Sequence, residues 1–309
     1  MNIVYSADHS FFSGDQFERL KKLEDIEGIK VFVHVGDGGP PLLPIGTIDY
    51  LINIALLKVH DLDEFTNLKQ IQLFSAGMDM LDMPRITAKG ITVKNASDVY
   101  SVPIAEFVLM RILEIHKSSR YFETIRDEKS THKKRDLVEL FGKTCAIYGY
   151  GSIGREIAMR LKCFGVKTVG ISRSGKTDDY LDRGLTVAES GKHIGEFDIV
   201  VSCLPQSEDS EKFFNKEYFE AMKQGASFVN ISRGGVVDET ALIDAVKAGK
   251  FLGVALDVFE KEPLPQTSEL WGLDNVYLSP HNSFASTIMY DRLFDRIYEN
   301  LLAFIEENK

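Results

Sequence analysis

The sequence predicts an α/β protein of two domains, each a parallel sheet flanked by helices. Short apolar runs alternate with polar or amphipathic segments, first over residues 1–98 and again from Thr144 onward, which is typical of βα units. A length of 309 residues, with 44% hydrophobic and 27% charged residues, suits two domains of about 100 to 200 residues each.

The first series of short apolar runs predicts strands at residues 3–5, 30–35, 50–54, 70–74 and 92–94. Apolar residues then recur at helical spacing from Val102 to about Tyr121, which predicts one long helix.

The second series runs from residue 144 to about residue 278 and predicts six more strands. They lie at residues 144–148, 168–171, 199–203, 227–230, 253–256 and 276–279. Helical periodicity returns between residues 286 and 307. We therefore expect a domain of residues 99–280 inserted in a smaller one of residues 1–98 and 281–309, with crossings near Val102 and Phe284 that act as a hinge.

Composition excludes several classes of function. A formal net charge of −10 argues against a nucleic-acid partner, because phosphate binding needs clustered Lys and Arg. Cys145, Cys163 and Cys203 are far apart, in no CxxC or His-paired arrangement, so we expect neither disulfides nor a metal site. No stretch approaches the roughly 18 apolar residues of a membrane span, and the first residues do not resemble a signal peptide. These absences predict a cytoplasmic protein without a membrane partner.

A glycine-rich loop directly follows the strand predicted at residues 144–148, and an amphipathic segment follows the loop. Strand, loop and helix occur in the order of a Rossmann dinucleotide site. Gly149 permits the tight turn, Gly151 lets the backbone approach a pyrophosphate, and Gly154 lets the helix pack on the strand. The predicted cofactor is NADP or NAD, and the loop that binds it reads Gly149, Tyr150, Gly151, Ser152, Ile153 and Gly154.

The next predicted strand should end on the acidic residue that binds the adenosine ribose hydroxyls of NAD. The sequence has Ser172, Arg173 and Ser174 there instead. With no carboxylate to repel it and a guanidinium to bind it, a ribose 2′-phosphate fits, which favours NADP. The alternative is that Arg173 only stacks on the adenine.

Three later residues each follow a predicted strand: Arg233 in a glycine-rich turn, then Glu262, then His281. The carboxyl edge of a parallel sheet is where ligands bind. Reduction of a 2-ketoacid needs a cation for the carboxylate, an acid for the carbonyl oxygen and a fixed nicotinamide. Arg233 and His281 supply the first two, and Glu262 would orient His281 and stabilise its imidazolium. Taken singly, a histidine after a strand is more often structural, and Glu262 is as simply a surface residue; all three at the ends of successive strands, beside a dinucleotide loop, favour a reacting site.

The sequence resembles the D-isomer-specific 2-hydroxyacid dehydrogenase family. The resemblance is carried by residues 140–154, 232–239, 255–259, 262–263 and 279–281. It implies hydride transfer between NAD(P)H and a small 2-ketoacid or D-2-hydroxyacid, as in a hydroxypyruvate or glyoxylate reductase. In that family pattern Arg233 binds and polarises the ketoacid, His281 is the acid/base and Glu262 is its partner.

The same resemblance implies a flavodoxin-like substrate domain, an active site in the cleft between the domains, a homodimer and no metal. It assigns the substrate carboxylate to the backbone N–H groups of Ser75, Ala76 and Gly77. It assigns cofactor contacts to Cys203, Leu204, Pro205, Ile231 and Asp257, the last toward the nicotinamide carboxamide.

Two departures from the family pattern concern specificity. Ser172 and Arg173 replace the acidic ending common in NAD-using members. Asn282, Ser283 and Phe284 follow the histidine where many members have small residues, which predicts a substrate pocket with its own shape.

Two other functions remain open on the sequence alone. One is a non-catalytic NAD(P)-sensing binding protein, which turnover of a 2-ketoacid would exclude. The other is a dehydrogenase for formate, phosphite or an amino acid on the same scaffold. A His–Glu pair suits transfer of a hydroxyl or carbonyl proton better than formate oxidation, in which no proton need move in the hydride step.

Overall fold

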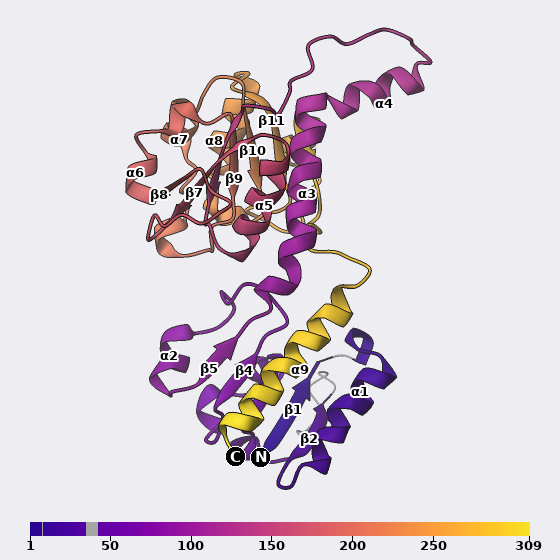
Figure 1. The fold of residues 1–309 in the computed structure, drawn as a ribbon, viewed down its shortest axis with the longest axis vertical. Coiled ribbons are helices and arrows are strands. Elements are labelled where there is room, and N and C mark those ends of the chain that lie inside the picture. Colours follow the sequence, from indigo (N-terminus) through magenta and orange to yellow (C-terminus); the bar gives the residue numbers. More distant parts are fainter. Residues whose placement is uncertain (8, 35–42) are drawn as a thin grey trace. The chain divides into compact units, whose positions relative to one another are not determined.

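The computed structural model describes residues 1–7, 9–34 and 43–309. The chain divides into two compact units, unit 1 with residues 1–100 and 286–309, and unit 2 with residues 101–285 (Figure 1). Each unit contains one sheet in which every paired strand is parallel, so the predicted fold class is confirmed.

Unit 1 has a five-stranded sheet in the order β2-β1-β3-β4-β5, the order of flavodoxin-like folds. All five predicted strands are present, although residue 35 at the end of the second prediction lies outside the described residues. The strands are β1 Asn2–Ser6, β2 Lys30–His34, β3 Tyr50–Ile52, β4 Gln70–Gln72 and β5 Thr92–Lys94, and the helices are α1 Gly14–Lys21, α2 Met83–Ala88 and the C-terminal α9 Met289–Glu307.

Helix α9 belongs to unit 1 although it follows unit 2 in the sequence. Its apolar residues Leu293, Ile297 and Leu301 recur every four positions and are fully buried, as expected for one face of a helix. The ring of Phe304 contacts that of Tyr50 on β3 at a centroid distance of 4.8 Å. Helix α9 therefore covers the unit 1 sheet, as Figure 1 shows.

Unit 2 has a seven-stranded sheet in the order β12-β11-β10-β9-β6-β7-β8. The strand order reverses between β6 and β9, and in open α/β sheets ligands bind at the carboxyl side of such a switch point. The strands are β6 Thr144–Tyr148, β7 Lys167–Ser172, β8 Arg183–Thr186, β9 Ile199–Ser202, β10 Ala226–Asn230, β11 Phe251–Leu256 and β12 Val276–Leu278. The helices that follow α3 Ser97–Lys117 are α4 Ser119–Asp127, α5 Ser152–Cys163, α6 Val187–Ser190, α7 Lys216–Ala221 and α8 Glu239–Lys247.

The central strands of this sheet are completely buried and closely packed. Every residue of β9 and β10 is buried, which explains why both strands consist largely of consecutive apolar residues rather than an alternating pattern. Phe228 on β10 packs edge to face with Phe214 and Phe219 at centroid distances of 5.0 and 5.5 Å. The ends of these strands are therefore well fixed.

Two local predictions differ from the structure. The single helix predicted for residues 102–121 is two helices, because Ser118 has a left-handed backbone (φ 52°) that ends α3 before α4 begins. Strand β8 was not predicted, because this short edge strand is only partly buried and lacks an apolar run. Among the described residues, no helix is both long and apolar enough to cross a membrane.

The boundaries between the units also differ slightly from those expected. The first falls after Tyr100, inside α3, and the second after Ala285 rather than after residue 280. The second shift has a physical reason, since the carboxylate of Asp257 in unit 2 accepts hydrogen bonds from the backbone N–H groups of Asn282 and Ser283. His281 is thereby part of unit 2.

His116, in the last turn of α3, is a buried titratable group. Its Nε2 lies 3.0 Å from Ser227 Oγ on β10, and its Nδ1 has no hydrogen-bond partner among the described residues. Burial lowers the pKa of His116 to about 4, and the nearby Lys143 and Lys117 act in the same direction. The folded protein therefore keeps this imidazole neutral.

This burial predicts a loss of stability in mild acid. Between about pH 6.5 and pH 4 the unfolded chain binds a proton at His116 that the folded chain excludes, so this contribution falls as the pH drops through that window. At pH 5 the loss is about 2 kcal/mol relative to pH 7.5. Urea denaturation of the wild type and His116→Gln at both pH values should show a smaller loss in the variant; equal losses would contradict the burial of a neutral imidazole.

Candidate active site

The glycine loop begins with a turn that only glycine can form. Gly149 has φ 84°, and a Cβ there would lie 2.4 Å from the carbonyl oxygen of Cys203. The N–H groups of Gly149 and Tyr150 donate to the carbonyl of Ile171 at the end of β7, and Cys203 N donates to Tyr148 O at 2.7 Å. The loop is thus held in backbone contact with the ends of β7 and β9.

Gly151 and Gly154, the other two glycines of the loop, differ in what surrounds them. A Cβ on Gly151 would meet nothing closer than 4.0 Å, whereas one on Gly154 would lie 3.1 Å from Ile147 on β6. No side chain caps α5, and the N–H groups of Ser152, Ile153 and Gly154 donate to no described residue. Open space before unpaired donors at a helix N-terminus suits a pyrophosphate, so these residues fit the predicted dinucleotide.

The end of β7 carries no carboxylate. Ser172 Oγ accepts a hydrogen bond from Gly175 N at 3.2 Å, and Arg173 and Ser174 are exposed. No hydrogen bond or ion pair joins the Arg173 side chain to another described residue. The first acidic residue along this loop, Asp178, was missed by reasoning from spacing because it comes six positions after the strand.

The remaining predicted cofactor contacts lie at the same sheet edge. Leu204 and Pro205 follow β9, and Pro205 O accepts a hydrogen bond from Ser210 Oγ at 2.6 Å. Ile231 follows the neighbouring β10 and is buried, and its N–H donates to Ser202 O at 3.3 Å.

The structure brings Glu262 and His281 together. Glu262 follows β11 and His281 follows β12, which are neighbours in the sheet. His281 Nδ1 lies 2.9 Å from Glu262 Oε2, while Glu262 Oε1 accepts from Phe259 N at 3.1 Å. The side chains are 43% and 37% exposed, so the pair is accessible, and His281 Nε2 has no hydrogen-bond partner among the described residues. Nε2 is therefore the ring nitrogen that stays open to a ligand.

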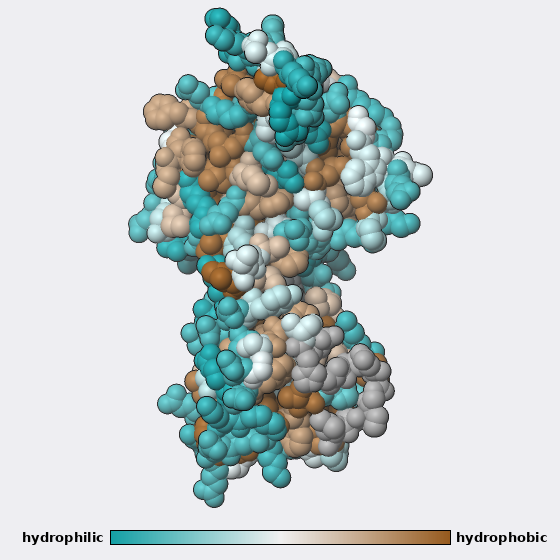
Figure 2. All heavy atoms as spheres, turned by 90° about the vertical axis from the view of Figure 1, so that its right-hand side faces the viewer, coloured by the Kyte–Doolittle hydropathy of each residue, from teal (hydrophilic) through white to brown (hydrophobic). Residues whose placement is uncertain are grey.

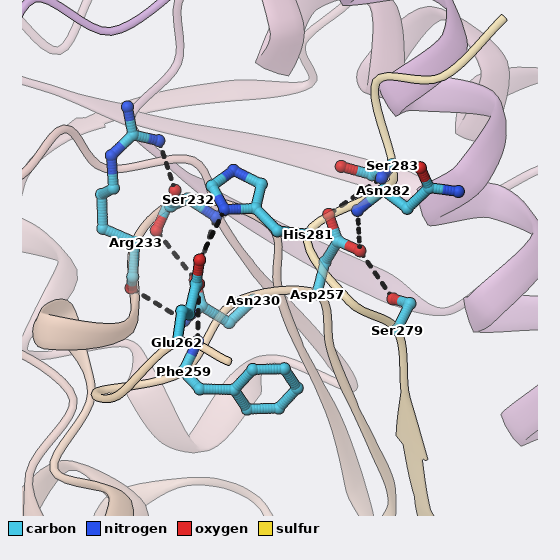
Figure 3. A network of polar contacts seen from close by, with 10 residues as sticks. All are labelled: Asn230, Ser232, Arg233, Asp257, Phe259, Glu262, Ser279, His281, Asn282 and Ser283. Atoms are coloured by element: carbon cyan, nitrogen blue, oxygen red, sulfur yellow. Dashed lines mark hydrogen bonds and ion pairs between the residues drawn. The ribbon is translucent and has the colours of Figure 1, made fainter. Parts of the chain in front are cut away.

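Arg233 lies in the turn after β10. Its Nη1 donates to Ser232 O at 2.8 Å, and Asn230 Nδ2 donates to the carbonyl of Arg233 at 3.0 Å. A Cβ on Gly234 would lie 1.8 Å from Phe259 O, so the turn packs directly on the segment that leads to Glu262. Figure 3 shows the Arg233 guanidinium and the His281 ring extending to the same side of this network.

Asp257 holds the turn that carries His281. Its buried carboxylate, 1% exposed, accepts hydrogen bonds from Ser279 Oγ at 2.6 Å and from the N–H groups of Asn282 and Ser283 at 2.9 Å each. His281 N donates to Asp257 O at 2.7 Å, and His281 has a left-handed backbone with φ 51°. Both carboxylate oxygens are therefore occupied by this turn (Figure 3), and a contact of Asp257 with a nicotinamide carboxamide stays a prediction.

An apolar pocket of about 560 Å³ lies beside the His–Glu pair within unit 2. The sequence did not indicate it, because its walls come from separate loops. It is lined by Phe259, Glu262, Pro263, Leu264, Trp271, Leu278, Ser279, Pro280 and His281.

Ser75, Ala76 and Gly77 belong to unit 1, in the loop after β4. The N–H groups of these three residues donate to no described residue, whereas three successive carbonyls of the loop are occupied. Free donors on a loop whose acceptors are already bonded suit an anion such as a carboxylate. The donors to the carbonyls are Tyr100 Oη to Phe74, Ala96 N to Ser75 at 3.0 Å and Asn95 Nδ2 to Ala76 at 2.8 Å.

Within the described ranges, no group of three or more His, Cys, Asp or Glu side chains is arranged to hold a metal ion.

Comparisons with known proteins identify the family of this chain. The sequence model described as "D-isomer specific 2-hydroxyacid dehydrogenase, NAD binding domain" matches residues 108–283. The chain is 34% identical over 268 residues to the glyoxylate reductase of Pyrococcus furiosus, covering 83% of this chain and 79% of that protein.

Two solved structures are similar over 99% of this chain and 96% of their own. One is a D-isomer specific 2-hydroxyacid dehydrogenase family protein from Aeromonas salmonicida, with a TM-score of 0.81 and 28% identity. The other is a D-isomer specific 2-hydroxyacid dehydrogenase from Xanthobacter autotrophicus in complex with NADPH and MES, with a TM-score of 0.80 and 27% identity.

The fold and the comparisons define a nicotinamide-dependent oxidoreductase. This chain belongs to the D-isomer-specific 2-hydroxyacid dehydrogenase family, which confirms the resemblance seen in its motifs.

The Asp257 network predicts a measurable effect on the His281 turn. In Asp257→Asn the amide nitrogen cannot accept a hydrogen bond, so at least one N–H of Asn282 or Ser283 loses its partner. Hydrogen–deuterium exchange of residues 279–285 should become faster, with a loss of folding stability of about 1–3 kcal/mol. The exposed Asp244→Asn is the matched control. Unchanged exchange in Asp257→Asn would show that the carboxylate does not hold the turn.

Proposed function

We propose that this chain reduces a small 2-ketoacid to the D-2-hydroxyacid, with NADPH preferred over NADH. The observation that carries the proposal is the His281–Glu262 pair next to the Arg233 turn, in the same unit and at the same sheet edge as a dinucleotide-type glycine loop. The glyoxylate reductase name of the Pyrococcus relative supports glyoxylate as one substrate. When bound, a nicotinamide cofactor would supply the hydride for the carbonyl carbon.

The roles of the protein side chains follow from their chemistry. The planar guanidinium of Arg233 binds the substrate carboxylate and draws electron density from the adjacent carbonyl. His281 Nε2 would donate a proton to the carbonyl oxygen, which becomes the hydroxyl oxygen of the product. Glu262 fixes the ring through Nδ1 at 2.9 Å, which leaves Nε2 directed to the substrate. In unit 1, the N–H groups of Ser75, Ala76 and Gly77 are proposed to bind a carboxylate, as the family resemblance implies.

The preference for NADPH rests on the loop after β7. Arg173 is exposed, and the hydroxyl groups of Ser172 and Ser174 on either side of it can donate hydrogen bonds to a phosphate. Asp178, the first carboxylate beyond them, already accepts hydrogen bonds from Tyr150, Tyr180 and Arg155. The Xanthobacter structure, solved with NADPH, supports the same preference.

A homodimer, which the family resemblance implies, is part of the proposal. Helix α4 contributes no buried residue to unit 2, and Phe122 on it is 43% exposed. Phe141 and Trp271 are exposed on the same unit, and Figure 2 shows hydrophobic residues lying among hydrophilic ones on one face of unit 2. Such exposed apolar side chains suit contact with a second copy.

Oxidation of NADPH and NADH at 340 nm with glyoxylate, hydroxypyruvate, pyruvate and longer 2-ketoacids tests the proposal. We expect turnover that is faster with NADPH, and a His281→Gln variant with kcat lowered by about 10²- to 10⁴-fold because the proton donor is lost. Binding of NADPH to that variant, followed by its fluorescence, is the control for an intact cofactor site. Tight NADPH binding without turnover of any ketoacid would favour a sensor, and faster turnover with NADH would contradict the cofactor preference.

A further inference from the structure

The second residue of the glycine loop, Tyr150, has a side chain that the dinucleotide pattern does not require. Its half-buried ring lies on Gly170 in the middle of β7. A Cβ at Gly170 would lie 2.9 Å from Tyr150 Cγ and 2.4 Å from Leu181 Cδ1, so the missing side chain leaves the space for this ring. Tyr150 thereby reaches across β7 to the loop that joins β7 to β8.

The Tyr150 hydroxyl donates a hydrogen bond to Asp178 Oδ1 at 2.8 Å in that loop. Asp178 also accepts from Tyr180 N at 2.9 Å and, through Oδ2, from Arg155 Nε at 3.1 Å. The Arg155 guanidinium in turn lies 4.5 Å from the centre of the Tyr180 ring. We call these four residues, Tyr150, Arg155, Asp178 and Tyr180, the Asp178 latch.

The protonation states suit this network. Burial, together with the adjacent Asp178 carboxylate, raises the pKa of Tyr150, so its hydroxyl remains a donor. Burial alone would raise the pKa of Asp178, but the hydrogen bonds from Tyr180, Tyr150 and Arg155 outweigh it and lower that pKa. A neutral phenol and an ionised carboxylate form a charge-assisted hydrogen bond, which is stronger than one between neutral groups.

Besides the latch, two further hydrogen bonds hold the turn that follows β7. Gly175 N donates to Ser172 Oγ at 3.2 Å at the start of the turn, and Lys162 Nζ donates to Asp179 O at 2.9 Å beyond it. The segment between these anchors carries Arg173 and Lys176, and neither side chain is joined by a hydrogen bond or ion pair to another described residue. The positively charged side chains of Arg173 and Lys176 therefore lie on a turn that the latch connects to the glycine loop and to the first turn of α5.

We propose that Asp178 is a positioning residue for cofactor selectivity: through Tyr150 and Arg155 it holds the turn of residues 173–177 beside the glycine loop, so that Arg173 meets the ribose 2′-phosphate of NADPH. This inference rests on the proposed preference for NADPH. Asp178 itself touches no phosphate, and it acts by fixing the geometry in which a guanidinium binds one.

A simple charge effect and the latch predict opposite results for loss of the Asp178 carboxylate. Removing a negative charge near a phosphate site, and releasing Arg155, would tighten NADPH binding a few-fold by electrostatics alone. Loss of the latch loosens the turn and weakens NADPH binding. The sign of the change therefore separates the two explanations.

The experiment measures the dissociation constants of NADPH and NADH by fluorescence titration of the full chain. Asp178→Asn removes the charge and the Arg155 ion pair, whereas Tyr150→Phe removes only the hydroxyl and keeps every charge. Asp179→Asn is the matched control, because Asp179 is exposed and no hydrogen bond or ion pair joins its side chain to another described residue. Thermal denaturation of each variant verifies that the chain is folded.

We expect both latch variants to bind NADPH about tenfold more weakly and NADH less than about threefold more weakly. Asp179→Asn should leave NADPH binding unchanged or slightly tighter. Unchanged or tighter NADPH binding in Asp178→Asn and Tyr150→Phe would overturn the latch, and so would an equal loss for both cofactors. If the wild type binds NADPH no more tightly than NADH, both the proposed preference and the latch are wrong. If the wild type prefers NADPH and the two latch variants bind it as tightly as the wild type does, only the latch is wrong.

Discussion

The parallel pairing of seven strands in unit 2 is the constraint on which the candidate site depends. Parallel strands end on one edge, and the register places Asn230 beside Leu256 and Leu256 beside Leu278. The turns that follow these residues therefore meet, although they are far apart in the sequence. Arg233, Glu262 and His281 are brought to one edge by backbone hydrogen bonds, before any contact among their own side chains.

Close backbone contacts then convert this edge into a site of defined geometry. Gly149 and Gly234 each stand where a Cβ would collide with a carbonyl oxygen, so the glycine loop and the Arg233 turn lie directly on the segments that follow neighbouring strands. Asp257 adds a buried carboxylate that holds His281 in a left-handed backbone conformation. Such a conformation costs free energy for a residue with a Cβ, and the hydrogen bonds around Asp257 offset that cost.

Much of this was predictable from the sequence, and the exceptions share a cause. Buried strands such as β6 and β9 are continuous apolar runs, and a glycine loop has few steric alternatives, so both could be predicted. Asp178 and Asn95 could not, because each acts through a tertiary contact that leaves no periodic or spacing signal. The break at Ser118 likewise depends on one backbone torsion angle in a segment whose apolar residues continue at helical spacing.

The most direct test is whether Arg233 recognises the substrate carboxylate. The measurement is kcat/KM for the best 2-ketoacid and for its primary amide, in the wild type and in Arg233→Ala. A guanidinium that binds the carboxylate in bidentate fashion predicts a wild-type preference for the acid of about 100-fold or more, which falls to within a few-fold in the variant. The same preference in both proteins would show that another group binds the carboxylate and would contradict the assignment of Arg233.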